Sequence, residues 1–189
     1  MIYNYIFLVS WIVFLVYWGV TAIGSKKNIQ QPGLLGSNVL FRVVFLLAVI
    51  LILSRPGPAM WLHQHQYLML KPIAKPIGAL CCVVGITLAI WSRKILGKNW
   101  GMPMSLKEEP ELVTVGPYNY IRHPIYTGVL LAILGSALAV GIVWFIVFIG
   151  GIIYFTWSAL QEQKNMLRLF PEQYPVYKQR TKMFIPFVV

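Results

Sequence analysis

The sequence predicts an all-helical integral membrane protein with about five transmembrane helices. Hydrophobic residues make up 58% of the 189 residues and charged residues only 11%, whereas about a quarter of the residues of a soluble domain are charged. The apolar residues form runs near the ~20 residues that a membrane-spanning helix needs, and the basic residues lie mainly between these runs. The composition therefore excludes an ordinary soluble domain and a disordered chain.

Three spans are expected in the first half of the chain. The first apolar run, about Ile2–Ile23, lacks a basic start and is too long for a signal peptide, so we interpret it as a transmembrane helix. A second span is expected at about Asn38–Ser54, because the two prolines of Arg55–Pro58 cannot continue a helix. The third is expected at about Pro76–Ile95.

A longer apolar run, Ile125–Leu160, follows a mixed loop that covers residues 96–124. As one helix it would measure ~54 Å, against ~30 Å for the hydrocarbon core. We therefore expect two helices that form a hairpin, with the turn near Ala139–Gly141. The tail after residue 160 is polar and basic, but its recurring aromatic residues indicate that it is ordered.

The net charge of +11 would suggest a nucleic-acid partner in a soluble protein. Here the basic residues flank apolar runs, which favours an anionic lipid surface instead. With five spans, twelve Lys and Arg residues lie on the side of the first loop, third loop and tail, and three lie on the other side. This asymmetry predicts that the third loop and the C-terminus face the cytoplasm and that the N-terminus faces outside. The twelve are Lys26, Lys27, Arg93, Lys94, Lys98, Lys107, Arg122, Lys164, Arg168, Lys178, Arg180 and Lys182, and the three are Arg55, Lys71 and Lys75.

Two regions on that side carry residues suited to chemistry. In the segment GPYNYIRHPIYTG, residues 116–128, Arg122 and His123 precede Pro124, at the positively polarised start of the fourth span. An interfacial belt of Tyr and Arg is the structural alternative for this segment. Glu162, just beyond the fifth span, is one of only five acids, and a salt bridge to Arg122 or Lys164 is the structural alternative for it.

Other patterns in the sequence do not indicate a metal site, a dinucleotide site or a catalytic triad. His63 and His65 are two residues apart with no acid or cysteine nearby, which does not predict a metal site. The adjacent Cys81 and Cys82 lie in an apolar run and are expected to pack as small apolar groups. A Gly-rich dinucleotide fingerprint and a Ser-His-Asp order are also absent from the sequence.

Together the two regions resemble the isoprenylcysteine carboxyl methyltransferase family and its phospholipid methyltransferase relatives. The signature Gly-Pro-Tyr-x4-His-Pro-x-Tyr-x-Gly is complete at residues 116–128, and the resemblance covers about residues 96–186, roughly half of the chain. Further matching positions are Leu96-Gly97-Lys98-Asn99-Trp100, Leu112-Val113, Glu162, Met166, Phe170, Tyr174, Tyr177 and Ile185-Pro186. The resemblance divides a single membrane domain, residues 1–189, into three N-terminal spans (1–95) and a methyltransferase-like part (96–189).

The resemblance implies an enzyme that uses S-adenosylmethionine, without a metal, to methylate a lipophilic or prenylated substrate that enters from the bilayer. The cofactor is expected in a pocket made by the cytoplasmic loop and the C-terminal tail. Glu162 is expected to act in catalysis as well as in cofactor binding, and His123 to orient the cofactor. The implied cofactor contacts are Leu112, Val113, Tyr118, His123, Pro124, Ile125, Tyr126 and Glu162.

Three positions depart from the family pattern. Ser158 stands where the family often has a basic residue, Gln163 replaces the second acid of a pair, and Pro171 follows Phe170 in place of Gly. Arg180 is the expected substitute anchor for a substrate carboxylate. Phospholipid N-methylation, which needs a base to take a proton from the amine, is the enzymatic alternative. A non-catalytic membrane scaffold or transport subunit is the alternative of another class.

Overall fold

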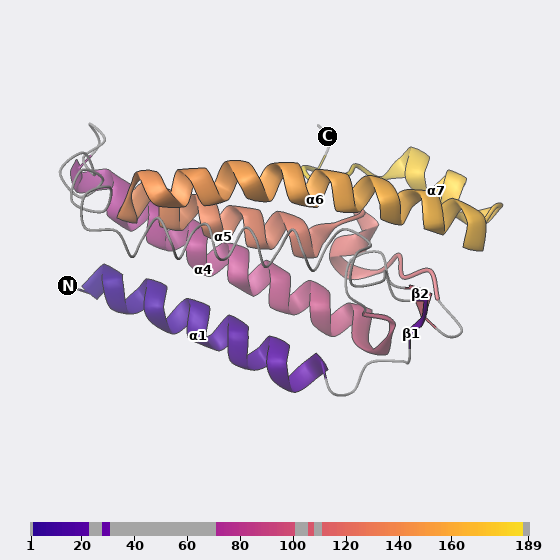
Figure 1. Cartoon of the computed structure of the whole chain (residues 1–189), viewed down its shortest axis with the longest axis horizontal. Helices are drawn as coiled ribbons and strands as arrows, with labels where there is room; N and C mark the ends of the chain where they lie inside the picture. Colours follow the sequence, from indigo (N-terminus) through magenta and orange to yellow (C-terminus); the bar gives the residue numbers. More distant parts are fainter. Residues whose placement is uncertain (1, 23–27, 31–70, 101–105, 108–110, 187–189) are drawn as a thin grey trace.

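In the described part of the chain, four long helices lie side by side (Figure 1). The computed structural model describes residues 2–22, 28–30, 71–100, 106–107 and 111–186. The long helices are α1 (Ile2–Ala22), α4 (Lys71–Leu96), α5 (Pro124–Val140) and α6 (Ile142–Leu169). The shorter elements are strands β1 (Asn28–Gln30) and β2 (Leu106–Lys107), 3-10 helices η1 (Gly97–Asn99) and η2 (Gly116–Asn119), and helix α7 (Gln173–Arg180).

The long helices coincide with four of the predicted spans. Among the described residues, three segments are long and apolar enough to cross a membrane, and a fourth, shorter apolar helix covers Pro124–Ala139. The prediction of an all-helical, multi-pass membrane protein is therefore confirmed. The second predicted span, residues 38–54, lies outside the described residues, so the count of five stays a prediction. The three segments are Ile2–Thr21, Ile73–Asn99 and Trp144–Leu169.

The last two helices form the predicted hairpin. Gly141 separates them with φ +134° and ψ −167°, a conformation that glycine adopts without the steric cost of a Cβ. Helix α6 then extends past the predicted end at Leu160 and reaches Leu169, because the Gln, Glu, Lys, Met, Leu and Arg residues of this stretch are good helix formers. Glu162 consequently lies on the helix itself.

Helix α4 also begins earlier than predicted, at Lys71, with Pro76 inside it. The apolar run predicted about Pro76–Ile95 for this span, so the five residues before Pro76 were not included. Helices in membrane proteins tolerate an internal proline when neighbouring groups satisfy the freed carbonyl.

Helices α4 and α5 approach until their backbones touch. A Cβ added at Gly85 would lie 2.4 Å from the carbonyl oxygen of Gly128, and one added at Gly135 would lie 2.4 Å from that of Gly78. In lipid, where apolar burial does not drive association between helices, such small-residue contacts supply close packing. Small side chains continue this contact and are buried, among them Ala79, Cys82, Ala89, Ala132 and Ser136. The burial of Cys82 agrees with its expected role as a small apolar group.

Two polar contacts tie α1 to this pair. Trp11 Nε1 donates to Ser136 Oγ at 3.1 Å, and Arg93 Nη2 donates to the carbonyl of Thr21 at 2.7 Å. Arg93 is only 3% exposed, and its guanidinium lies 4.4 Å from the ring centre of Trp100. A cation at the C-terminal turn of α1 is favourable because the unpaired carbonyls there carry partial negative charge.

The first loop, the third loop and the tail meet at one end of the bundle, as the charge pattern predicts. Strand β1 pairs antiparallel with β2, which joins the first loop to the third. Residues Thr181–Pro186 after α7, here called the C-terminal strap, pair through Lys182 with Ile121 in a parallel bridge. Strands β1 and β2 and helix α7 all lie toward the right-hand end of the bundle in Figure 1. Lys26 and Lys27 of the first loop lie outside the described residues.

The close contact between α4 and α5 predicts that alanine substitutions of glycine change stability in opposite directions at two positions. Gly85→Ala should lower stability by about 1–3 kcal/mol, the usual cost of overpacking, because its Cβ meets backbone. Gly19→Ala on α1 meets nothing within 4 Å and should gain up to about 1 kcal/mol from helix propensity. Reversible unfolding in mixed detergent micelles measures both. Equal effects of the two substitutions would contradict the close contact.

Candidate functional site

The site is built around the start of helix α5. Residues 120–123 form an irregular turn after η2, and His123 is the N-cap of α5 with φ −125° and ψ 58°. Pro124 occupies the first helical position and is fully buried. Proline is suited to this position because its missing N–H would have no partner inside the helix. The turn thus sets His123 beside the first turn of α5, which carries Ile125 and Tyr126.

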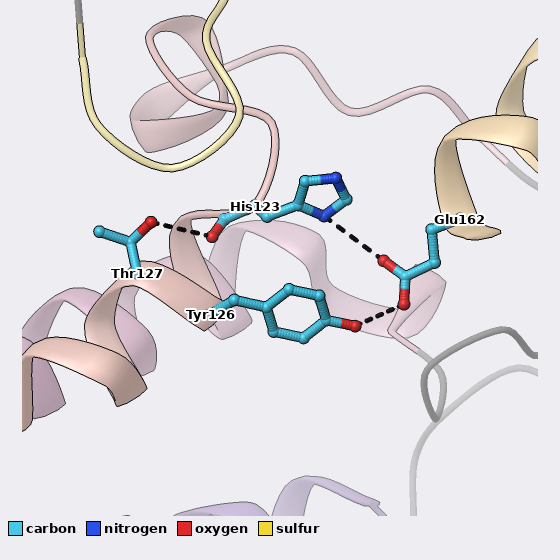
Figure 2. A network of polar contacts seen from close by, with 4 residues as sticks. All are labelled: His123, Tyr126, Thr127 and Glu162. Carbon is cyan, nitrogen blue, oxygen red and sulfur yellow. Dashed lines mark hydrogen bonds and ion pairs between the residues drawn. The ribbon is translucent and has the colours of Figure 1, made fainter. Parts of the chain in front are cut away.

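Glu162 of α6 joins two side chains of this turn (Figure 2). The Tyr126 hydroxyl donates a hydrogen bond to Glu162 Oε1, and His123 Nδ1 lies 3.4 Å from Glu162 Oε2. Each carboxylate oxygen has more than one acceptor site, so the carboxylate keeps acceptor capacity for a ligand. The salt bridge to Arg122 or Lys164 considered above is not what Glu162 forms in the described part of the chain. The guanidinium of Arg122 binds carbonyl groups of the tail instead.

Aromatic rings surround the His123 side chain. The imidazole is stacked parallel to the Tyr126 ring, with centroids 5.4 Å apart and planes 3° apart, and the Phe184 ring lies 6.0 Å away. Tyr126 in turn stacks on Phe155 at 4.7 Å. Phe155 and Phe184 were not among the residues predicted for the site. Phe155 lies seven residues, about two helical turns, before Glu162, and this spacing was the available signal.

Burial leaves one polar atom of the network without a partner. The His123 side chain is 9% exposed and that of Glu162 is 25% exposed. His123 Nε2 is buried and has no hydrogen-bond partner among the described residues. Since buried polar groups are nearly always hydrogen-bonded, an orphaned Nε2 next to an accessible carboxylate is suited to a polar ligand.

Tyr118 of η2 lies near this network and is 7% exposed. Burial raises the pKa of its phenol well above the ordinary value; Tyr177 and Glu162 raise the pKa further, while Arg93 lowers it. The Tyr177 hydroxyl donates to the carbonyl of Tyr118 at 2.7 Å. The Tyr118 phenol therefore keeps its proton at physiological pH, and the backbone of Tyr118 is tied to α7.

The remaining predicted residues lie at the margins. Leu112 and Val113 are half-buried in the segment that leads into η2, and Ile125 is half-buried on α5. Arg180 is exposed at the end of α7, with its guanidinium 5.7 Å from the ring of Tyr177. The roles predicted for these four residues, like those of the other predicted site residues, stay predictions. His63 and His65 lie outside the described residues.

Comparisons with known proteins match the same part of the chain. Residues 73–173 match the family model of the phospholipid methyltransferases. Phosphatidylethanolamine N-methyltransferase B of Dictyostelium discoideum is 32% identical over 137 residues, which cover 69% of this chain and 68% of that relative. The solved structure of a eukaryotic intramembrane Ras methyltransferase, an isoprenylcysteine carboxyl methyltransferase, has the same fold. Its TM-score is 0.60 at 21% identity, and the match covers 92% of this chain but only 63% of that one.

The buried tyrosines predict a loss of stability at alkaline pH. Burial raises the pKa of Tyr174 to about 12 and also raises that of Tyr177. A raised folded-state pKa contributes stability below the unfolded pKa of about 10, and this contribution is lost as pH rises toward 12. Thermal melts between pH 8 and 11.5 should therefore show a falling midpoint above pH 10. Tyr174→Phe should flatten that fall, while Tyr120→Phe, whose ring is 57% exposed, should leave it unchanged; an equally steep fall in both variants would contradict the assignment.

Proposed function

The chain belongs to the phospholipid methyltransferase family, and from that premise we propose that it transfers a methyl group from S-adenosylmethionine to a lipid-like acceptor at the His123–Tyr126–Glu162 site. It is an integral membrane methyltransferase. The observation that carries the proposal is the carboxylate of Glu162, held by Tyr126 and His123 within the part of the chain that matches the family.

The residues of this site fit S-adenosylmethionine. When bound, it supplies a methyl group on a positively charged sulfur, open to displacement by a nucleophile. Glu162 can accept hydrogen bonds from its hydroxyl or amino groups through the acceptor sites that Tyr126 and His123 leave free. The ring of Phe184 beside His123 is suited to a cationic ligand. Leu112, Val113, Pro124 and Ile125 would supply apolar walls that exclude water.

We favour the amine of a phospholipid headgroup as the methyl acceptor. A carboxylate acceptor beside Glu162 would be repelled unless a cation lay between them, and Ser158, one helical turn before Glu162, is neutral and fully buried. An ammonium group is attracted to the same carboxylate. It must lose a proton before it can act as a nucleophile. His123 Nε2 is a buried atom that could take this proton, since Glu162 faces the opposite ring nitrogen.

A second candidate is methylation of a prenylated cysteine carboxylate. The fold similarity to the isoprenylcysteine carboxyl methyltransferase favours it, as does the complete signature at residues 116–128. A carboxylate is ionised at neutral pH and needs no base. For this acceptor, Arg180 is the proposed anchor, and it would have to turn from the Tyr177 ring toward the substrate.

The proposal includes an orientation in the membrane. The excess of Lys and Arg on the side of the first loop, third loop and tail supports a cytoplasmic third loop and C-terminus, with the N-terminus outside. The donor would then bind from the cytoplasm, while a lipid acceptor reaches the site from the bilayer. The division into N-terminal spans (1–95) and a methyltransferase part (96–189) belongs to the same proposal.

A transfer assay separates the two acceptors. The purified protein is incubated with radiolabelled S-adenosylmethionine and either phosphatidylethanolamine in mixed micelles or N-acetyl-S-farnesylcysteine. We expect label in the phospholipid, and a loss of about a hundred-fold in Glu162→Ala because the donor is no longer positioned. Glu172→Ala removes an exposed acid of the tail and should keep full activity. Label in the farnesylcysteine alone would select the second candidate, and label in neither acceptor would contradict the proposal.

A further inference from the structure

We propose that Arg122 is a positioning residue for His123, acting by docking the C-terminal strap, Thr181–Pro186, against the start of α5. The inference rests on the proposed function only in taking His123 as a residue of the donor site. The docking itself follows from contacts of the described residues and is independent of any ligand.

Backbone hydrogen bonds join the strap to the turn before α5. Arg122 N–H donates to the carbonyl of Lys182 at 2.8 Å, and His123 N–H donates to that of Met183 at 3.1 Å. In return, Lys182 N–H donates to the carbonyl of Tyr120 at 3.2 Å. Arg122 and His123 precede the helix, so its hydrogen-bond ladder gives their amides no acceptor. The strap supplies the acceptors and thereby holds the His123 backbone, whose φ and ψ lie outside the helical region.

The Arg122 side chain holds the other end of the same segment. Its Nη1 donates to the carbonyls of Lys178, at 3.1 Å, and of Thr181. Both carbonyls lie at the C-terminal end of α7, where partial negative charge stabilises a cation. The start of α5, which Arg122 precedes, is positively polarised and gives a cation no such benefit. The guanidinium therefore gains its stabilisation from the tail and joins α7 to the turn.

The far end of the strap reaches His123 itself. The Phe184 ring lies 6.0 Å from the imidazole, and Thr127 Oγ1 donates to the carbonyl of Phe184 at 2.8 Å. The strap thus contacts the His123 amide, the His123 ring and the first turn of α5. Without the Arg122 contacts, the strap would no longer be held where it follows α7. His123 would then lose the Met183 carbonyl as acceptor for its amide and the Phe184 ring as a neighbour of its imidazole.

Hydrogen exchange tests the docking without any ligand. In Arg122→Ala, the amides of Arg122 and His123 should exchange faster, while those in the α4–α5 contact keep their protection and show that the fold is intact. Thr127→Val removes the hydroxyl's bonds to both Phe184 and the His123 carbonyl, so it should also speed exchange at His123. Lys182→Ala should have none, because the side chain of Lys182 is exposed and the strap uses its backbone. Unchanged exchange at His123 in Arg122→Ala would overturn the proposal.

Titration with S-adenosylhomocysteine tests whether Arg122 acts through His123. Arg122→Ala should weaken binding by about ten-fold, since a misplaced ligand group loses much of its contribution. The Arg122→Ala/His123→Ala double variant should bind no more weakly than His123→Ala alone. Additive losses would show that Arg122 contributes separately and would overturn the positioning role. If the wild type binds no S-adenosylhomocysteine, the proposed function fails, and the exchange result alone decides whether Arg122 docks the strap.

Discussion

The backbone contact between α4 and α5 is the constraint on which the rest of the structure depends. Gly78 and Gly85 face Gly135 and Gly128 so closely that any Cβ would strike a carbonyl oxygen. Gly128 lies about one turn after Pro124, so this contact also fixes the start of α5 and the turn that carries His123. In lipid the helices cannot rely on apolar burial for association. These four glycines therefore determine where the start of α5, and with it the site, lies relative to α4.

The site itself is assembled from segments far apart in the sequence. The turn before α5 supplies His123, α6 supplies Glu162, and the strap supplies a ring and backbone acceptors. The hairpin at Gly141 returns α6 along α5 and so brings Glu162 level with Tyr126. A partly buried carboxylate is costly unless it is hydrogen-bonded. Tyr126 and His123 satisfy it while leaving acceptor sites and one imidazole nitrogen for a ligand.

The helices and the loops between them could largely be predicted from the sequence, because the length of an apolar run and the position of a proline determine structure within a short segment. The hairpin turn, the ordered tail and the pairing of loops on one side followed from such patterns, and the family signature pointed to His123 and Glu162. The tertiary contacts could not be predicted in this way. Arg122 was a reasonable partner for Glu162 by charge, yet it binds tail carbonyls; nothing in its local sequence indicates that the strap lies beside it. The rings of Phe155 and Phe184 were missed for the same reason. Helix α6 continues beyond Leu160 because the polar residues there are good helix formers. The hydropathy pattern marks only the apolar part of the helix, so the prediction ended at Leu160.

The proposed chemistry depends on the Glu162 carboxylate being the centre of a donor-binding site. Calorimetric titration of S-adenosylhomocysteine into the detergent-purified protein tests it most directly, with Glu162→Ala and the exposed control Glu172→Ala alongside. We expect micromolar binding by the wild type and by Glu172→Ala, and loss of binding in Glu162→Ala with the fold retained. Equal binding by all three proteins, or no binding by a folded wild type, would contradict it.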